Sequence, residues 1–198
     1  MKIWFIIPIL CLCLFACEPT ESPNEASRPN IIYIIADDLG YGDLGVYGQK
    51  LISTPYIDQL AAGGMRFTQH YSGSTVCAPS RAVLMTGKHT GHSVVRGNRE
   101  IKPEGQFPMA DSVYTMAEMF REAGYSTAAF GKRGLGFPGS EGDPNRQGFD
   151  TFFGYNCQRH AHTYYPDYLW SNQTKAGIIE NAEGKQQIHS ADLIQDQV

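Results

Sequence analysis

An uninterrupted apolar segment near the start of the chain constrains the fold more than any other feature. The residues from Asn30 to Ala36 carry the sequence Ile-Ile-Tyr-Ile-Ile at their centre and contain no charged side chain. A short run that is apolar throughout predicts a strand buried on both faces, and such strands are typical of parallel sheets covered by helices. The segment therefore favours an α/β fold.

Helical and strand patterns alternate along the remainder of the chain. Helical patterns cover residues 54–62, 79–86, 112–123 and 192–198, and strand patterns cover residues 65–71 and 126–131. Thr54 and Ser190 are suited to capping the first and the last of these helices. The alternation predicts a mostly parallel, mixed sheet flanked by helices. The last helical pattern has no stop signal before Val198, so we expect the chain to be the first, truncated part of a domain.

The first 17 residues are typical of a leader rather than of a folded domain. Lys2 precedes an apolar stretch, Ile3 to Phe15, which is too short to cross a bilayer comfortably and matches the core of a signal peptide. The stretch leads into Leu-Phe-Ala-Cys, which resembles a bacterial lipobox. We therefore expect export to the periplasm, the outer membrane or the cell surface, with a lipid anchor on Cys17. A plain signal peptide cleaved near Ala16 is the alternative.

Composition sets further limits on the mature protein. Residues 18–28 are rich in Pro, Ser, Glu and Asn and predict a flexible tether, so the folded domain is expected over residues 29–198. The net charge of −4 argues against nucleic acid as a partner. If Cys17 carries a lipid, only Cys77 and Cys157 remain after the leader, so we expect no disulfide framework.

Two adjacent carboxylates follow the apolar segment. In open α/β sheets ligands collect at the carboxyl ends of strands, which is where Asp37 and Asp38 are expected to lie. Carboxylate oxygens are hard ligands that suit Ca²⁺ or Mg²⁺ better than zinc. For an isolated Asp-Asp pair a turn stabilised by side-chain hydrogen bonds would be the simpler interpretation. Its place after an apolar strand, together with the motif described next, favours a metal site.

The sequence Cys-Ala-Pro-Ser-Arg at residues 77–81 is the most specific motif. Cys77 is expected just before a helix N-terminus, which favours a thiolate, so it is either a catalytic thiol or a buried structural cysteine. Arg81 follows four residues later, about one helical turn away on the same face. Lys132 follows the predicted strand over residues 126–131 and is expected at its carboxyl end.

These motifs resemble the type I, formylglycine-dependent sulfatases of the alkaline phosphatase superfamily. The resemblance is carried by residues 30–48, 54–60, 77–87 and 124–136. It implies that a sulfatase-maturing enzyme oxidises Cys77 to formylglycine, whose hydrate attacks the sulfur of a sulfate ester. It also implies that Asp37, Asp38 and the residue at position 77 hold Ca²⁺, or Mg²⁺ in its place, together with ligands beyond Val198.

The resemblance implies roles for two basic residues as well. Arg81 would stabilise the hydrated aldehyde, and Lys132 would contact aldehyde and sulfate oxygens. The family pattern around this lysine is typically Gly-Lys-Trp-His-Leu-Gly, whereas this chain has Arg133 and Gly134 at the third and fourth places. The histidine that contacts the nucleophile in many relatives is therefore absent at residue 134, and the acid/base assignment stays open.

A histidine and aromatic cluster follows. In an extended segment His160 and His162 would share a face and either contact sulfate, protonate the leaving alcohol, or simply be surface histidines. Gln158 lies near the place where relatives have a polar sulfate contact. The neighbouring residues form either a stacking platform for a sugar or a packed layer beneath a loop: Arg159, Tyr164, Tyr165, Tyr168 and Trp170.

The resemblance implies a sulfuric ester hydrolase that cleaves sulfate esters of a glycan or an aryl alcohol. A phosphonate or phosphate ester hydrolase of the same superfamily is an alternative within the hydrolases. A non-catalytic anchored binding protein or an inactive fragment is an alternative from another class. Because further pocket residues are expected beyond Val198, we expect negligible turnover from the isolated chain.

Overall fold

The computed structural model describes residues 28–198. The expected leader over residues 1–17 and all of the tether except Arg28 lie outside the described residues. The chain divides into two units, one ending at Gly40 and the other running from Tyr41 to Val198, and each is described by itself. Within residues 28–198 no helix has the length and the apolar composition needed to cross a membrane.

The apolar segment of the first unit does not form the predicted strand. Residues 30–36 have no strand pairing, and Ile32 and Ile34 are 79% and 82% exposed. A strand that is apolar on both faces needs neighbours that satisfy its backbone and layers that cover both faces. No strand within residues 28–198 pairs with this segment. The segment ends in a turn at Asp37 and Asp38, where Asp38 takes a positive φ of 57°.

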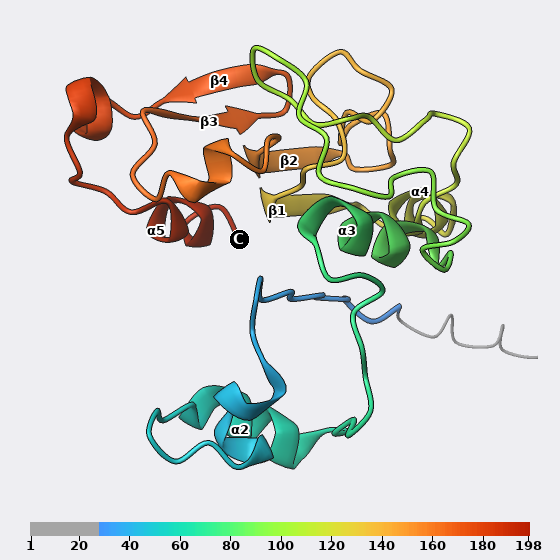
Figure 1. Cartoon of the computed structure of the whole chain (residues 1–198), viewed down its shortest axis with the longest axis vertical. Coiled ribbons are helices and arrows are strands. Elements are labelled where there is room, and N and C mark those ends of the chain that lie inside the picture. Colours follow the sequence, from blue (N-terminus) through green and yellow to red (C-terminus); the bar gives the residue numbers. More distant parts are fainter. Residues whose placement is uncertain (1–27) are drawn as a thin grey trace, which may run out of the picture. The chain divides into compact units, whose positions relative to one another are not determined.

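A four-stranded mixed sheet organises the second unit (Figure 1). Its strands are β1 (Ala128–Lys132), β2 (Thr151–Tyr155), β3 (Tyr168–Ser171) and β4 (Thr174–Gly177). The order is β1-β2-β3-β4, so β1 forms one edge. β1 and β2 are parallel, and the two remaining pairs are antiparallel. The parallel pair sets Lys132 beside Tyr155 at the carboxyl end of both strands, which is where the sequence predicted a site.

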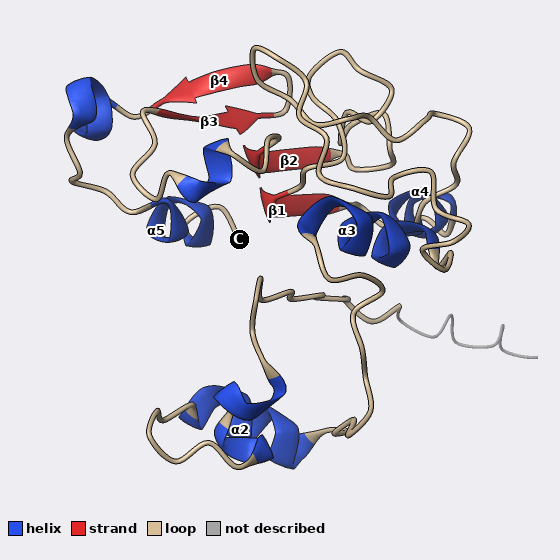
Figure 2. Ribbon diagram, viewed as in Figure 1, coloured by secondary structure: helices blue, strands red, loops and turns tan. Residues whose placement is uncertain are grey.

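Residues 28–198 contain four α-helices, as the sequence predicts (Figure 2). They are α2 (Pro55–Gly63), α3 (Cys77–Thr86), α4 (Met116–Glu122) and α5 (Ser190–Gln195). α4 begins later than predicted because Thr115 caps it, accepting a hydrogen bond from the Glu118 backbone N–H while the Glu118 carboxylate accepts one from Thr115 N–H. α5 begins at Ser190, with His189 as the cap instead.

The strand predicted over residues 65–71 is wrong. These residues have neither helix nor strand, and Met65 and Tyr71 are 80% and 81% exposed. Alternation alone does not make a strand, because the backbone also needs an adjacent edge with which to pair. None of the four described strands lies beside this segment in the sheet order.

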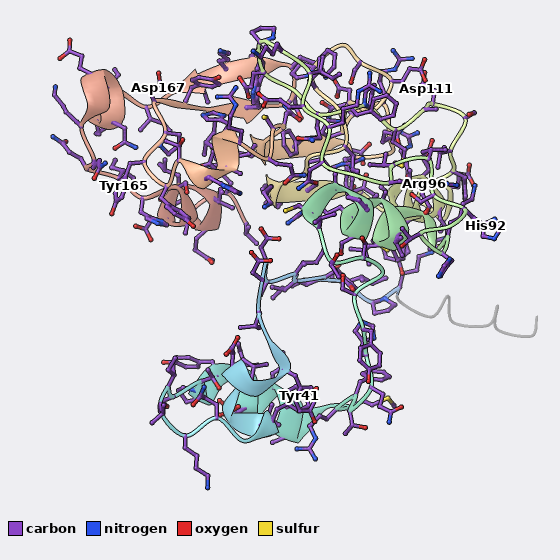
Figure 3. All side chains as sticks on the ribbon, viewed as in Figure 1. Tyr41, His92, Arg96, Asp111, Tyr165 and Asp167 are labelled. Atoms are coloured by element: carbon purple, nitrogen blue, oxygen red, sulfur yellow. The ribbon has the colours of Figure 1, made fainter. Side chains whose placement is uncertain are left out.

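The core beneath α3 fixes the start of that helix. Ala78, Ala82 and Met85 recur on one helical face, and all three are buried in a cluster with Leu135 and residues near α4. Figure 3 shows the side chains that project from α3, α4 and the neighbouring loops. Gly87 ends α3 in a left-handed conformation, with its N–H donating to Val83 O. Cys77 is therefore held by a helix that is anchored through its buried face.

Candidate active site

Cys77 is the first residue of α3 and is half-buried. Val76 precedes it in an extended conformation, and the Ser80 N–H donates to Val76 O at 3.0 Å, which closes the first turn. The Ala78 N–H donates to Asn98 Oδ1 at 2.8 Å, so a loop side chain satisfies one of the first N–H groups of the helix. The position of Cys77 is thus set by local backbone geometry.

One cationic side chain contacts Cys77, and a second contacts the backbone of the first. Lys132, the last residue of β1, places its Nζ 3.5 Å from Cys77 Sγ. The Arg81 guanidinium donates a hydrogen bond to the backbone oxygen of Lys132. The structure thereby brings together three residues that the sequence singled out from two separate motifs. Positive charge fixed beside a nucleophile lowers the energy of negative charge that develops on oxygen during attack.

Arg133, which departs from the family pattern, packs into the core. Its backbone N–H donates to Tyr155 O at 2.9 Å, which extends the pairing of β1 and β2. Its guanidinium carbon lies 5.7 Å from the centroid of the Phe149 ring. Burial and the charge of Arg81 lower the pKa of Arg133 to about 10, although Asp143 acts in the opposite direction. The Arg133 side chain is therefore buried against Phe149.

Gln158 fills the space that a side chain on residue 134 would need. Gly134 has a φ of 64°, and a Cβ atom there would overlap the Gln158 amide nitrogen. Gln158 is buried; its Nε2 donates to Gly134 O at 3.2 Å, and its backbone N–H donates to Gln106 Oε1 at 3.2 Å. The second departure from the family pattern is thus matched by a glutamine from another loop. No local pattern predicts this pairing, because 24 residues separate the two positions.

The two histidines occupy different environments. Residues 160–162 form a short 3-10 helix, η3, so the expectation that both rings share the face of an extended segment is wrong. His162 is exposed. The His160 ring lies 5.1 Å from the Tyr155 ring and 4.6 Å from the Tyr168 ring, measured between centroids. Only His160 is therefore held in a defined orientation by neighbouring side chains.

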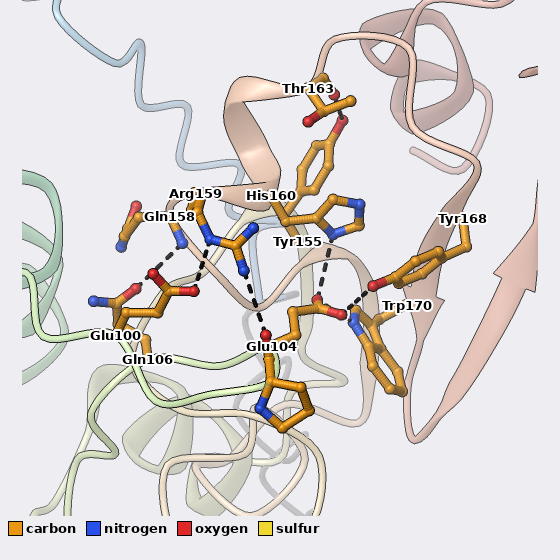
Figure 4. A network of polar contacts seen from close by, with 11 residues as sticks. Glu100, Glu104, Gln106, Tyr155, Gln158, Arg159, His160, Thr163, Tyr168 and Trp170 are labelled. Atoms are coloured by element: carbon orange, nitrogen blue, oxygen red, sulfur yellow. Dashed lines mark hydrogen bonds and ion pairs between the residues drawn. The ribbon is translucent and has the colours of Figure 1, made fainter. Parts of the chain in front are cut away.

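Glu104, which the sequence did not single out, connects His160 to the aromatic cluster (Figure 4). Its Oε1 lies 3.3 Å from His160 Nδ1 and accepts a 2.8 Å hydrogen bond from Trp170 Nε1, while Oε2 accepts one from the Tyr168 hydroxyl. Burial raises the pKa of Glu104, but these hydrogen bonds outweigh it and lower that pKa to about 2. Burial and the Glu104 charge raise the pKa of Tyr168. Glu104 is therefore a fixed negative charge.

The predicted metal ligands Asp37 and Asp38 belong to the first unit, where they form the turn after the apolar segment. Their carboxylates have the donor chemistry that Ca²⁺ and Mg²⁺ require. Within residues 28–198 no three His, Cys, Asp or Glu side chains gather into a metal-binding group. The two carboxylates therefore fit a hard-cation site as part of its ligand set, because Ca²⁺ takes about six to eight oxygen ligands.

Comparison with known proteins agrees with this geometry. The sulfatase family profile matches residues 29–196, and the chain belongs to the sulfatase family. It is 40% identical over 158 residues to arylsulfatase D of Homo sapiens, covering 75% of this chain. It is 48% identical over 132 residues to arylsulfatase A of Bos taurus, covering 65% of this chain. The matched parts amount to 26% and 25% of those two proteins, so the chain spans about a quarter of their length.

A solved structure is similar over most of the chain. It contains a protein in complex with its substrate, D-glucosamine-2-N,6-O-disulfate, and it matches with a TM-score of 0.65 at 30% identity. The match covers 86% of this chain and 30% of that chain. This similarity confirms the α/β, alkaline-phosphatase-like sulfatase fold expected from the sequence.

Proposed function

We propose that the protein to which this chain belongs hydrolyses sulfate esters, and that residue 77 supplies the nucleophile. The observation that carries the proposal is the placement of Lys132 Nζ 3.5 Å from Cys77 Sγ at the start of α3. Arg81 reinforces this arrangement by its hydrogen bond to the Lys132 backbone. Membership of the sulfatase family supports the reaction class.

The residues around position 77 fit the formylglycine that the motif predicts. Cys77 is half-buried at a helix start, and oxidation of its side chain by a sulfatase-maturing enzyme removes the thiol that faces Lys132. Formylglycine supplies a hydrated aldehyde as the nucleophile. Lys132 holds a sulfate oxygen by its charge and balances the negative charge that develops there. Arg81 keeps the backbone of Lys132 in place.

Asp37 and Asp38 would hold Ca²⁺, or Mg²⁺ in its place. The cation would supply a Lewis acid for the sulfate group. The two carboxylates contribute two negative charges that balance a divalent ion. This assignment rests on their donor chemistry and on family membership.

A sulfated carbohydrate is the proposed substrate, and an aryl sulfate is its simplest substitute. The similar structure bound to a glucosamine disulfate supports this choice. The Tyr168 ring is contacted by His160 and by Lys175, whose Nζ lies 3.7 Å from the ring centroid, so Trp170 is the aromatic side chain proposed to stack on a sugar ring. His160, His162 and Gln158 are the other proposed substrate-binding residues.

Export is proposed from the leader sequence. A lipid on Cys17 would anchor the protein at the periplasmic or outer face of a membrane, in reach of extracellular glycans. A sulfatase-maturing enzyme is the expected partner inside the cell, and the mild acidity of the chain speaks against a nucleic acid partner. Isolation of the exported protein with a lipidated N-terminal Cys17 would test the anchor.

Peptide mass spectrometry of the exported full-length protein tests the proposed chemistry. Conversion to formylglycine makes the peptide that contains Cys77 about 18 Da lighter. Rates on a sulfate ester and a phosphate ester of the same phenol then separate a sulfatase from a phosphate hydrolase. An active enzyme with an unmodified thiol would reject formylglycine, and faster phosphate hydrolysis would reject the sulfatase assignment. The chain of residues 18–198 produced alone is expected to have negligible turnover.

A further inference from the structure

The Arg133 guanidinium is a buried charge without a hydrogen-bond acceptor. The residue is 6% exposed, and within residues 28–198 none of the nitrogens Nε, Nη1 and Nη2 donates to a protein atom. Burial lowers the pKa of Arg133 to about 10, so the group keeps its positive charge at neutral pH. A guanidinium has five N–H donors, and burying them without an acceptor is costly because their hydration is lost. The site therefore requires an acceptor that the surrounding protein atoms do not supply.

The charged side chains nearby do not meet this requirement. Arg81 adds a second positive charge, which lowers the pKa of Arg133 further, whereas the negative charge of Asp143 raises that pKa. Asp143 is itself buried, and both of its carboxylate oxygens already accept hydrogen bonds from other donors. No hydrogen bond joins it to the Arg133 guanidinium. The charge of Arg133 is therefore balanced only at a distance.

The aromatic neighbour of Arg133 attracts its charge but accepts none of its hydrogen bonds. The guanidinium carbon lies over the Phe149 ring, 5.7 Å from the centroid. A ring face favours a cation because of its quadrupole, yet it offers no oxygen or nitrogen lone pair to the N–H groups. The contact with Phe149 thus explains how the side chain packs and leaves its donors unsatisfied.

A second buried side chain with unpaired polar atoms stands next to Arg133 in the sheet. Asn156 is 1% exposed, and within residues 28–198 neither its Nδ2 nor its Oδ1 has a hydrogen-bond partner. β1 and β2 are parallel with their last residues in register, and Arg133 and Asn156 are the residues that directly follow. The Arg133 N–H also donates to the Tyr155 oxygen at 2.9 Å. Corresponding residues of adjacent strands project toward the same face, so both sets of unsatisfied donors come to one place.

We propose that Arg133 and Asn156 bind a chloride ion at the carboxyl ends of β1 and β2. The guanidinium N–H groups and Asn156 Nδ2 are the donors, and the ion supplies the missing negative charge. A monatomic anion suits the site, because both residues are almost fully enclosed and leave little room for a larger oxyanion. The ion is a structural ligand and takes part in no reaction. This proposal does not rest on the proposed function.

A chloride ion at this position would stabilise the turn that follows β1. Arg133 lies between Lys132, whose Nζ contacts Cys77, and Gly134, whose oxygen accepts a hydrogen bond from Gln158. The unfolded chain does not hold the two donor residues together, so the ion binds the folded state selectively. A ligand of this kind stabilises the folded protein in proportion to the logarithm of its concentration above Kd. Chloride should therefore act on stability, independently of any substrate.

Thermal unfolding of the full-length mature protein tests the proposal. Sodium chloride is exchanged for sodium gluconate at constant ionic strength, so that only the small anion varies. The unfolding midpoint should rise by about 1 °C for each tenfold increase in chloride above its Kd. Arg133→Met should remove this dependence. Arg146→Met, which alters an exposed arginine paired with Asp111, is the matched control and should retain it.

Direct binding measurements locate the ion. Broadening of the ³⁵Cl NMR signal by the unaltered protein should be reduced in Arg133→Met, and Asn156→Leu should weaken chloride binding by about tenfold, because one hydrogen bond to a charged group is lost. Crystals of the unaltered protein grown in bromide should show an anomalous peak beside the Arg133 guanidinium. This last measurement decides the proposal even if Arg133→Met does not fold.

The outcomes separate a chloride site from other acceptors. A midpoint that does not respond to chloride, or the absence of a bromide peak beside Arg133, would overturn the proposal, and water or a carboxylate from another part of the full-length protein would then satisfy the guanidinium. An equal chloride response in Arg133→Met would overturn it as well. None of these measurements involves sulfate ester hydrolysis, so their failure leaves the proposed function intact, and an inactive enzyme would not affect the chloride site.

Discussion

The Cys77 cluster and the Glu104–His160 pair lie at the same end of the sheet but are encoded differently. Cys77 and Arg81 are four residues apart in one helix, and Lys132 ends a strand. Glu104 lies in a loop 56 residues before His160, and the two meet only through the folded chain. The first region was predicted from short motifs, whereas the second is formed by contacts between distant segments. A short motif thus points to candidate site residues but not to the side chains that surround them.

The largest effect is expected at Cys77. Cys77→Ala removes the nucleophile, so kcat on 4-nitrophenyl sulfate should fall by about 10⁴-fold or more in the full-length enzyme. Cys77 is half-buried, so the midpoint of thermal unfolding should hardly change. Steady-state kinetics and a thermal melt check both statements. Activity close to that of the unaltered enzyme would contradict the proposal, because the motif would then not contain the nucleophile.

Lys132 should have the next largest effect. Lys132→Ala removes the charge 3.5 Å from position 77, and loss of one such stabilising group costs about 10²- to 10³-fold in kcat. Both aryl and sugar sulfates should be affected equally, because the charge acts on the sulfate group that they share. The exposed Lys88→Ala is the matched control. A larger loss of kcat on the sugar sulfate than on the aryl sulfate in Lys132→Ala would contradict a role of Lys132 at the sulfate group.

Gly134 sharpens the comparison because it joins the two regions. Gly134→Ala forces a side chain into a left-handed conformation, which costs about 1–2 kcal/mol, and displaces the Gln158 amide. Urea unfolding should therefore show a loss of at least this size. In the Gln158→Ala background the same change should cost less, because the overlap is gone. Strict additivity of the two changes would indicate that Gln158 does not occupy this space in solution.

The smallest expected effect concerns pH and Glu104. Its pKa is lowered from 4.5 to about 2 in the folded protein, so it stabilises the fold above about pH 4.5, and this contribution is lost as the pH falls toward 2. We expect this contribution to be about 1 kcal/mol. Unfolding free energies at pH 6 and pH 3 should differ by less in Glu104→Gln than in the unaltered protein. If the difference between pH 6 and pH 3 were equal in Glu104→Gln and in the unaltered protein, groups other than Glu104 would cause the pH dependence.

The sequence predicted those parts of the fold that depend on local rules. α2 and α3 were predicted because proline at the start and glycine at the end mark helix limits without reference to the rest of the chain. A strand was also predicted over residues 126–131, where β1 runs from Ala128 to Lys132. The segments 30–36 and 65–71 were not, since an apolar or alternating pattern cannot state whether a neighbouring strand is available.

The same division applies to the candidate site. Cys77, Arg81 and Lys132, which the sequence singled out, are linked by the contact of Lys132 with Cys77 and by the hydrogen bond from Arg81 to Lys132 O. Glu104 was missed because its role comes from donors on β3 and η3, and no pattern around it announces them. The sequence did not predict that Gln158 fills the space beside Gly134. The two residues lie in different loops, and their contact is seen only in the folded structure.

The edge position of β1 has a practical consequence for handling the chain. Within the described sheet β1 pairs only with β2, so its other side presents backbone amides and carbonyls along a short, uncharged run that ends at Lys132. Such a margin can recruit a strand from another molecule. Preparations of residues 18–198 are therefore expected to self-associate as they are concentrated, and light scattering across a dilution series would reveal it.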